Sequence, residues 1–176
     1  MNTHPVRGMD HVGITVADIE QATRFFAEAF GAEVIYDSVK RSDENLKGAD
    51  QESHLHLFEG TAIKAVRMLK LQNGPGVELF EMHGPEQRAP ARPSDFGIQH
   101  FAVYVDDIDE AVRLFERAGG KMFSRPLPLT FPTEIGKGNA FCYGRTPWGS
   151  VIELITLPST PPYERQTALR RWKPAK

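Results

Sequence analysis

Residues 10–31 and 99–120 of this chain repeat one pattern, DHVGITVADIEQATRFFAEAFG in the first copy and QHFAVYVDDIDEAVRLFERAGG in the second. A constant offset of 89 residues, with no gap, aligns His11 with His100. A later pair of segments also matches, VELF at 77–80 and IELI at 152–155, so that each half has one late glutamate, Glu78 or Glu153. Such a repeat predicts two equivalent structural units. Two His and two Glu at matching places indicate one metal site built from both halves.

Length and composition fit this reading and exclude several classes of protein. A chain of 176 residues with 40% hydrophobic residues can form one compact domain, or two small modules that share a core. The net charge of -2 gives no basic surface for nucleic acid. Cys142, the single cysteine, excludes an internal disulfide and a cysteine-rich zinc site. With no signal-peptide core at the N-terminus and no apolar run of about 18 residues, we expect a cytoplasmic protein without a membrane span.

The first predicted module covers residues 8–82. It begins with an alternating strand at 9–16, followed by a helix that Asp18 caps and Gly31 ends. Residues 38–60 are polar and irregular, and they predict an insertion or a long loop. Asn73 and Gly74 indicate a hairpin between two of the remaining strands, which we expect at 33–37, 61–71 and 77–82.

A proline-rich linker at 83–97 leads to the second module, residues 98–157. This module repeats the order, with a helix that begins at Asp107. A mobile loop is expected at 121–138, and strands are expected at 98–105, 139–144 and 150–157. The tail, 158–176, is expected to end in a short basic helix, YERQTALRRWK.

The phase of the strands predicts where the polar residues point. The helix of each module must cover the apolar side of its strand, which places His11 and His100 on the other side. The same alternation puts Glu78 and Glu153 on that side, so the four residues can line one concave surface. Glu81 is the inward carboxylate instead of Glu78 if a bulge shifts the phase of the strand.

These four positions, in DHVGITV, VELFEM, GIQHFAVYV and WGSVIELITL, resemble the vicinal-oxygen-chelate superfamily over roughly residues 8–157. This superfamily includes glyoxalase I, methylmalonyl-CoA epimerase, the extradiol dioxygenases and the bleomycin resistance proteins. The resemblance implies an α+β fold of two tandem βαβββ modules, which form a cup-shaped, eight-stranded mixed sheet with the helices outside. It also implies one divalent metal, Zn, Ni, Co, Mn or Fe, held by His11, Glu78, His100 and Glu153. The stretch FEMHG at 80–84 looks closer to the epimerases than to glyoxalase I.

We therefore expect a metal-dependent lyase or isomerase of the glyoxalase/epimerase type, which moves a proton next to a metal-bound carbonyl of a small molecule. Resemblance to glyoxalase I makes Glu153 the candidate base. The alternatives are a non-haem iron dioxygenase of the extradiol type, with Glu78 idle, and a non-enzymatic binding protein of the resistance type.

The remaining candidate residues concern the pocket and the assembly. Phe80 and Tyr104 are expected as pocket walls, and Arg67 as a contact for an anionic substrate group. His54 and His56 have ligand-like spacing on a strand, but we favour a solvated or substrate-loop role. A homodimer is expected, with the tail as part of the contact.

Overall fold

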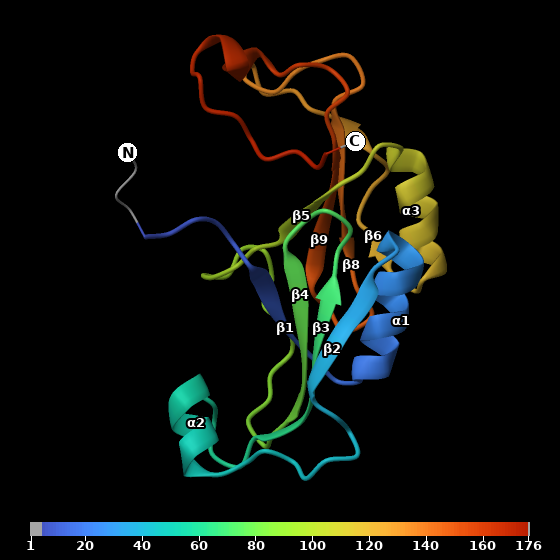
Figure 1. The fold of residues 1–176 in the computed structure, drawn as a ribbon. Helices are drawn as coiled ribbons and strands as arrows, with labels where there is room; N and C mark the ends of the chain where they lie inside the picture. Colours follow the sequence, from blue (N-terminus) through green and yellow to red (C-terminus); the bar gives the residue numbers. More distant parts are fainter. Residues whose placement is uncertain (1–4, 176) are drawn as a thin grey trace. The chain divides into compact units, whose positions relative to one another are not determined.

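The computed structural model describes residues 5–175, in two compact units. The first unit comprises the chain up to Thr23 together with Gly31–Gln87. Its elements are β1 (His11–Val16), α1 (Ile19–Phe30, shared with the second unit), β2 (Glu33–Val39), α2 (Ala49–Leu55), β3 (Ala62–Lys70) and β4 (Gly76–His83) (Figure 1). The four strands form one sheet in the order β1-β4-β3-β2. Strands β1 and β4 are parallel, and the other neighbours are antiparallel.

The second unit comprises Arg24–Phe30 and the chain from Arg88 onward. Its elements are β5 (Phe101–Tyr104), α3 (Ile108–Arg117), β6 (Lys121–Met122), β7 (Leu127–Pro128), β8 (Ala140–Arg145), β9 (Val151–Thr156) and the 3-10 turn η1 (Pro162–Arg165). The strand order is β5-β9-β8-β6, and β7 also pairs with β8. As in the first unit, the strand that precedes the helix pairs in parallel with the last strand, here β5 with β9.

The expected α+β class is confirmed. Residues 5–175 contain nine strands in two mixed sheets and three α-helices. The eight strands that were expected in one sheet are thus bonded as two separate sheets of four and five strands. Alternation along a strand predicts its buried face, but it does not predict which strand edges are hydrogen-bonded to each other.

Both predicted helix starts are confirmed. The Asp18 carboxylate accepts hydrogen bonds from the backbone N–H of Glu20 and of Gln21, at 2.9 and 3.0 Å. Asp107 accepts from the N–H of Glu110 at 3.0 Å. These bonds satisfy amides at the start of each helix that have no partner within it. Gly31 follows α1 with a φ of 64°, the left-handed conformation that ends many helices.

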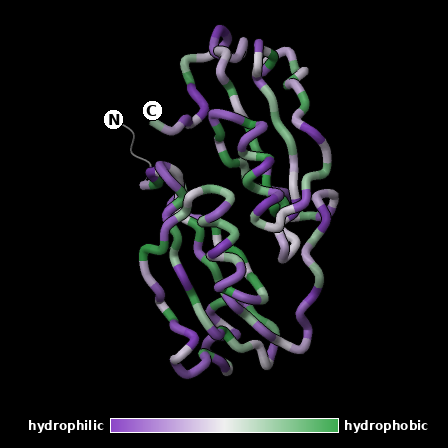
Figure 2. The backbone as a smooth tube through the Cα atoms, turned by 90° about the vertical axis from the view of Figure 1, so that its right-hand side faces the viewer, coloured by the Kyte–Doolittle hydropathy of each residue, from purple (hydrophilic) through white to green (hydrophobic). Residues whose placement is uncertain are grey.

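The predicted phase of β1 also holds. In β1, Ile14 and Val16 are buried whereas His11, Gly13 and Thr15 are exposed. Figure 2 shows hydrophobic and hydrophilic residues interleaved along the chain trace. In each sheet we call the face opposite the helix the open face, and His11 lies on it in the first unit.

Aromatic side chains form much of the second unit's core. Phe25, from the C-terminal half of α1, packs edge-on against Phe115 and Trp148, with ring centroids 5.1 and 5.2 Å apart. Phe25 and Phe115 are both almost completely buried. Helix α3 itself packs against β9 and β6. The helix-covered face of this sheet is thereby fixed, and the opposite face has Glu153 beside Tyr143.

Several local features differ from the predictions. The irregular stretch 38–60 contains the helix α2, and the loop 121–138 contains the short strands β6 and β7. The tail forms only the 3-10 turn η1 instead of a basic helix, and its last residue, Lys176, lies outside the described residues.

No helix within residues 5–175 has the length and apolar character needed to cross a membrane.

Candidate functional site

In the first unit, His11 and Glu78 stand on the same face of neighbouring strands. The parallel register pairs His11 with Gly76 and Gly13 with Glu78, so the two side chains are separated by one step of the pleat. His11 Nε2 lies 3.3 Å from Glu78 Oε2, and His11 Nδ1 lies 2.8 Å from Asp10 Oδ2. The hydrogen bond with Asp10 raises the pKa of His11, and the charge of Glu78 raises it further.

In the second unit, His100 and Glu153 form the equivalent pair. His100 directly precedes β5, and the register pairs Ala102 with Glu153. His100 Nε2 lies 2.9 Å from Glu153 Oε2, and its Nδ1 lies 2.8 Å from the amide oxygen of Gln99. The side chain of Glu153 is 12% exposed, and this burial raises its pKa although His100 acts in the opposite direction.

The two pairs occur at the same register in the two sheets. Val12 pairs with Val77 in the first sheet and Phe101 with Ile152 in the second, and these residues correspond at offsets of 89 and 75. The duplication therefore preserves the pairing of the strands as well as the residue types.

Asp10 and Gln99 were missed in the sequence analysis. Each directly precedes its histidine, and its side-chain oxygen accepts a hydrogen bond from Nδ1, which leaves Nε2 facing the carboxylate. Such contacts orient an imidazole for a ligand at its other nitrogen. A signal was present, because the offset of 89 residues also aligns Asp10 with Gln99.

Each pair thus offers an imidazole nitrogen and a carboxylate oxygen to the same point, which suits a divalent transition metal. Across residues 5–175, no group of three or more His, Cys, Asp or Glu side chains gathers closely enough to hold a metal ion. Each unit therefore supplies two of the four predicted ligands.

The expected pocket residues Phe80 and Tyr104 lie beside these pairs. Phe80 is on β4, two residues after Glu78, and packs against a cluster of Ile63, Val66 and Met82. In the second unit, Tyr104 packs against a cluster of Leu129, Ile155 and Leu157. The Tyr104 hydroxyl donates a hydrogen bond to the backbone carbonyl of Leu157 at 3.3 Å.

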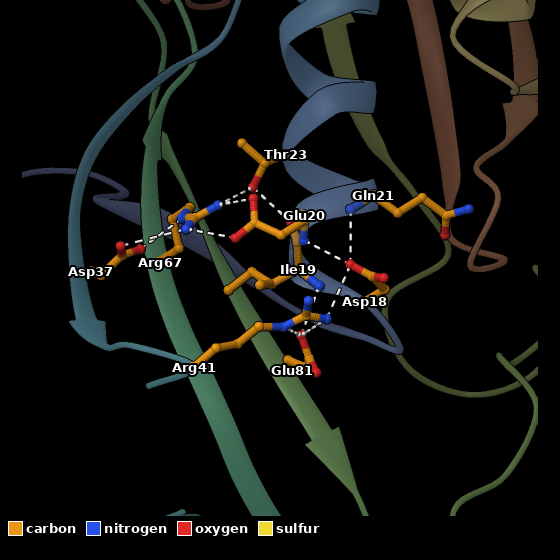
Figure 3. Close-up of polar contacts among 9 residues, drawn as sticks. All are labelled: Asp18, Ile19, Glu20, Gln21, Thr23, Asp37, Arg41, Arg67 and Glu81. Atoms are coloured by element: carbon orange, nitrogen blue, oxygen red, sulfur yellow. Dashed lines mark hydrogen bonds and ion pairs between the residues drawn. The ribbon is translucent and has the colours of Figure 1, made fainter. Parts of the chain in front are cut away.

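Arg67 lies on the opposite side of its sheet. Its register partner is Leu79, which is fully buried on the helix-covered face. The guanidinium donates to Asp37 at 2.6 Å, to Glu20 at 3.0 and 3.1 Å, and to the Thr23 hydroxyl at 2.9 Å (Figure 3). Asp37 and then Glu20 raise the pKa of Arg67. Arg67 thus links α1 to the sheet, and it is not part of the proposed pocket.

Glu81 also lies on the helix-covered side, away from His11. Its carboxylate accepts hydrogen bonds from the backbone N–H of Ile19 at 2.9 Å and from Arg41 Nε at 2.8 Å (Figure 3). Its side chain is 4% exposed. Glu81 is therefore satisfied at the start of α1, and Glu78 is the carboxylate that faces His11.

His54 and His56 do not lie on a strand. His54 is in the last turn of α2, and His56 follows that helix with a φ of 53°. Both side chains are exposed. The spacing that resembled a ligand pair belongs to a helix end, where the two side chains do not share a strand face.

The chain belongs to the Glyoxalase/Bleomycin resistance protein/Dioxygenase superfamily, which matches residues 10–143. A 2-epi-5-epi-valiolone epimerase from an Actinomyces species is 36% identical over 166 residues, which cover 93% of this chain and 87% of that protein. A putative lactoylglutathione lyase from Brassica oleracea var. gemmifera is 23% identical over 161 residues, or 91% of this chain. The chain spans about half of that lyase, 48% of its length.

Solved structures of the same superfamily share the fold. A glyoxalase family protein from Bacillus cereus aligns with a TM-score of 0.66 and 22% identity, over 89% of this chain and 97% of that chain. A mutant of the fosfomycin resistance protein FosX from Listeria monocytogenes, in complex with Mn(II) and 1S,2S-dihydroxypropylphosphonic acid, aligns with a TM-score of 0.57 and 15% identity. This second alignment covers 92% of this chain and 99% of that chain.

Proposed function

We propose that this protein is a metal-dependent isomerase or lyase of the glyoxalase/epimerase type, and more narrowly an epimerase of a hydroxylated ketone. One observation carries the proposal, namely the His–Glu pair that recurs at the same register in β1/β4 and in β5/β9. A strand duplication that preserves two metal-ligand types, together with their spacing, favours a shared catalytic task over a purely structural one.

The proposed ligands are His11, Glu78, His100 and Glu153. In each pair, Nε2 of the imidazole already faces the carboxylate, and Nδ1 is held by the preceding residue. When bound, a divalent metal supplies Lewis-acid polarisation of the substrate's neighbouring oxygens. The Mn(II) complex of the FosX mutant supports the choice of a divalent ion, since that protein has the same fold.

Glu153 is the proposed base. It is the more buried of the two carboxylates, and water therefore competes less for its oxygens. Glu153 takes a proton from the carbon next to the substrate carbonyl. A base that returns the proton to the same side of that carbon causes only exchange, so inversion requires a donor on the other side. Glu78, the equivalent residue of the other half, is the proposed donor in its protonated form, and proton exchange with water then restores both carboxyl groups.

The relative and two arginines support this choice of substrate class. The 36% identical relative acts, by its name, on a valiolone, and this name denotes a ketone. In the first unit, Arg67 and Arg41 are both bonded to carboxylates on the helix-covered side of the sheet. Neither guanidinium is available there to bind a phosphate or a carboxylate, which fits a neutral substrate better than an anionic one.

Proton exchange in D₂O tests the reaction. The protein is loaded with Zn, Ni, Co, Mn or Fe in turn and incubated with 2-epi-5-epi-valiolone, while ¹H NMR follows the hydrogen next to the carbonyl. We expect this signal to disappear and the signals of an epimer to grow, at the same rate with and without O₂. No exchange with any of the metals would remove the proposal, and strict O₂ dependence would support the dioxygenase alternative.

Metal analysis tests the ligand set independently. Protein purified without chelator should contain near-stoichiometric metal, and His11→Ala and His100→Ala should each lower this content. His54→Ala is the matched control, because His54 is exposed on α2 and should leave the metal content unchanged. Unchanged metal in both ligand variants would contradict the assignment.

We also propose that the two open faces complete the cup-shaped arrangement of the superfamily and that the protein is a homodimer. The exposed edge strand β2, with Val34 and Ile35 about half exposed, provides apolar surface for such an assembly. Light scattering at micromolar concentration should give twice the mass of the chain, and the mass of one chain would contradict the dimer.

A further inference from the structure

Tyr143 is the neighbour of Glu153 on the adjacent strand. The antiparallel register of β8 and β9 pairs Tyr143 directly with Glu153, and both belong to the open face. In the first unit, the register of β3 and β4 pairs Met68 with Glu78 in the same way. Met68 and Tyr143 are related by the same offset of 75 residues as the two glutamates. The two halves therefore differ at this position, since only the second has a hydroxyl group.

The Tyr143 ring is held by aromatic contacts. Its centroid lies 5.0 Å from that of His100 with an interplanar angle of 69°, and 5.6 Å from that of Phe141 with an angle of 74°. These contacts fix the ring between the proposed metal ligand and the wall of the open face. The side chain is thus ordered by the protein before any substrate binds.

The hydroxyl of Tyr143 has no hydrogen-bond partner within residues 5–175, although the side chain is half-buried. The hydroxyls of two other tyrosines differ in this respect. Tyr104 donates to the Leu157 carbonyl, and Tyr163 accepts from the N–H of Arg171 at 2.9 Å. The Tyr143 oxygen is not among the buried polar atoms, so solvent reaches it and the hydroxyl is free to bond a molecule from outside the chain.

We propose that Tyr143 binds the substrate by a hydrogen bond from its hydroxyl to a substrate oxygen, and that this bond orients the reacting carbon toward Glu153. This inference rests on the proposed function. A thioether at the equivalent position of the first unit cannot donate such a bond. A substrate oxygen is consequently recognised at the Glu153 half, and this agrees with the assignment of Glu153 as the base.

Tyr143→Phe tests the proposal, because it removes only the hydroxyl and keeps the ring that contacts His100. With 2-epi-5-epi-valiolone, we expect the KM to rise about 3- to 10-fold, as for the loss of one neutral hydrogen bond. The metal content and the thermal midpoint should not change. Tyr36→Phe is the matched control, since Tyr36 is about half exposed on the edge strand β2 and should leave KM unchanged.

A binding measurement complements the kinetics. In protein labelled with [¹³Cζ]tyrosine, the Tyr143 signal is identified by its absence from Tyr143→Phe, and it should shift when the valiolone is added. An unshifted signal, or a KM equal to that of the wild type, would overturn the role of Tyr143 and leave the proposed function standing. Loss of metal in Tyr143→Phe would also overturn the substrate-binding role, and it would indicate that Tyr143 holds His100 in place. Wild-type protein that neither exchanges the substrate proton nor binds the ketone would overturn both.

Discussion

Glu81 should be among the most important polar side chains for the stability of the first unit. Its buried carboxylate accepts from the backbone N–H of Ile19, at the start of α1, and from Arg41 Nε and Nη2 at 2.8 and 2.7 Å (Figure 3). A carboxylate at this end of a helix also interacts favourably with the helix dipole. In Glu81→Ala the N–H of Ile19 loses this acceptor, and Arg41 loses its buried partner.

The size of the effect can be estimated from these contacts. An unsatisfied buried N–H costs about 1–3 kcal/mol, and the lost dipole interaction adds up to about 1 kcal/mol. The ion pair adds less than about 1 kcal/mol because the side chain of Arg41 is 44% exposed. We expect Glu81→Ala to lower the free energy of unfolding by about 2–4 kcal/mol. Glu81→Gln keeps an acceptor for Ile19 and should cost about 1 kcal/mol.

Urea denaturation followed by circular dichroism gives these free energies. Glu28→Ala is the matched control, because Glu28 is an exposed glutamate on the same helix and should change stability by less than about 0.5 kcal/mol. Arg41→Gln should lie between the control and Glu81→Ala, since the bond from Ile19 remains. A Glu81→Ala variant as stable as the control would refute the view that this carboxylate anchors α1.

Three further predictions concern other parts of the chain. Asp107→Ala removes the N-cap of α3 and should cost about 1 kcal/mol of unfolding free energy in the same urea assay, whereas an unchanged midpoint would argue against the cap. Burial raises the pKa of Cys142 to about 11, so a thiol reagent at pH 8 should leave it unmodified until the protein is unfolded. The thiol ionises more readily in the unfolded chain, so the free energy of unfolding should decrease as the pH rises above the ordinary pKa of a cysteine thiol. Asp10→Ala and Gln99→Ala should each weaken metal binding about 10- to 100-fold in a competition assay with a chelator, and equal affinities would show that these two side chains do not orient the imidazoles.

The sequence predicted the features that depend on repetition and on alternation. The two helix caps and the exposed side of β1, on which His11 lies, follow from residue spacing within a half. Such patterns are local, or are repeated at a fixed offset, and one chain is then enough to show them.

Features that depend on partners distant in sequence were not predicted. Helix α2 has seven residues, none of them buried, and therefore no periodic apolar stripe. Its end is held by hydrogen bonds that the backbone N–H groups of Leu57 and Gly60 donate to Glu52. The role of Arg67 depends on Asp37 and Glu20, two residues of other elements that meet it only in the folded sheet. The two-residue strands β6 and β7 are likewise defined by their pairing with β8.

Glu153→Gln provides the most direct test of the chemistry. Glutamine has the size of glutamate and still offers an oxygen to a metal, but it cannot accept a proton from carbon. His100 Nε2 can still contact that oxygen, so the fold and most of the metal content should be retained. Turnover of 2-epi-5-epi-valiolone should fall by about two orders of magnitude or more, the usual contribution of a positioned base. The exchange of the substrate proton in D₂O should fall to the same extent, because both processes need the same step. Full turnover by Glu153→Gln would remove Glu153 as the base, whereas loss of turnover together with loss of metal would reduce Glu153 to a ligand.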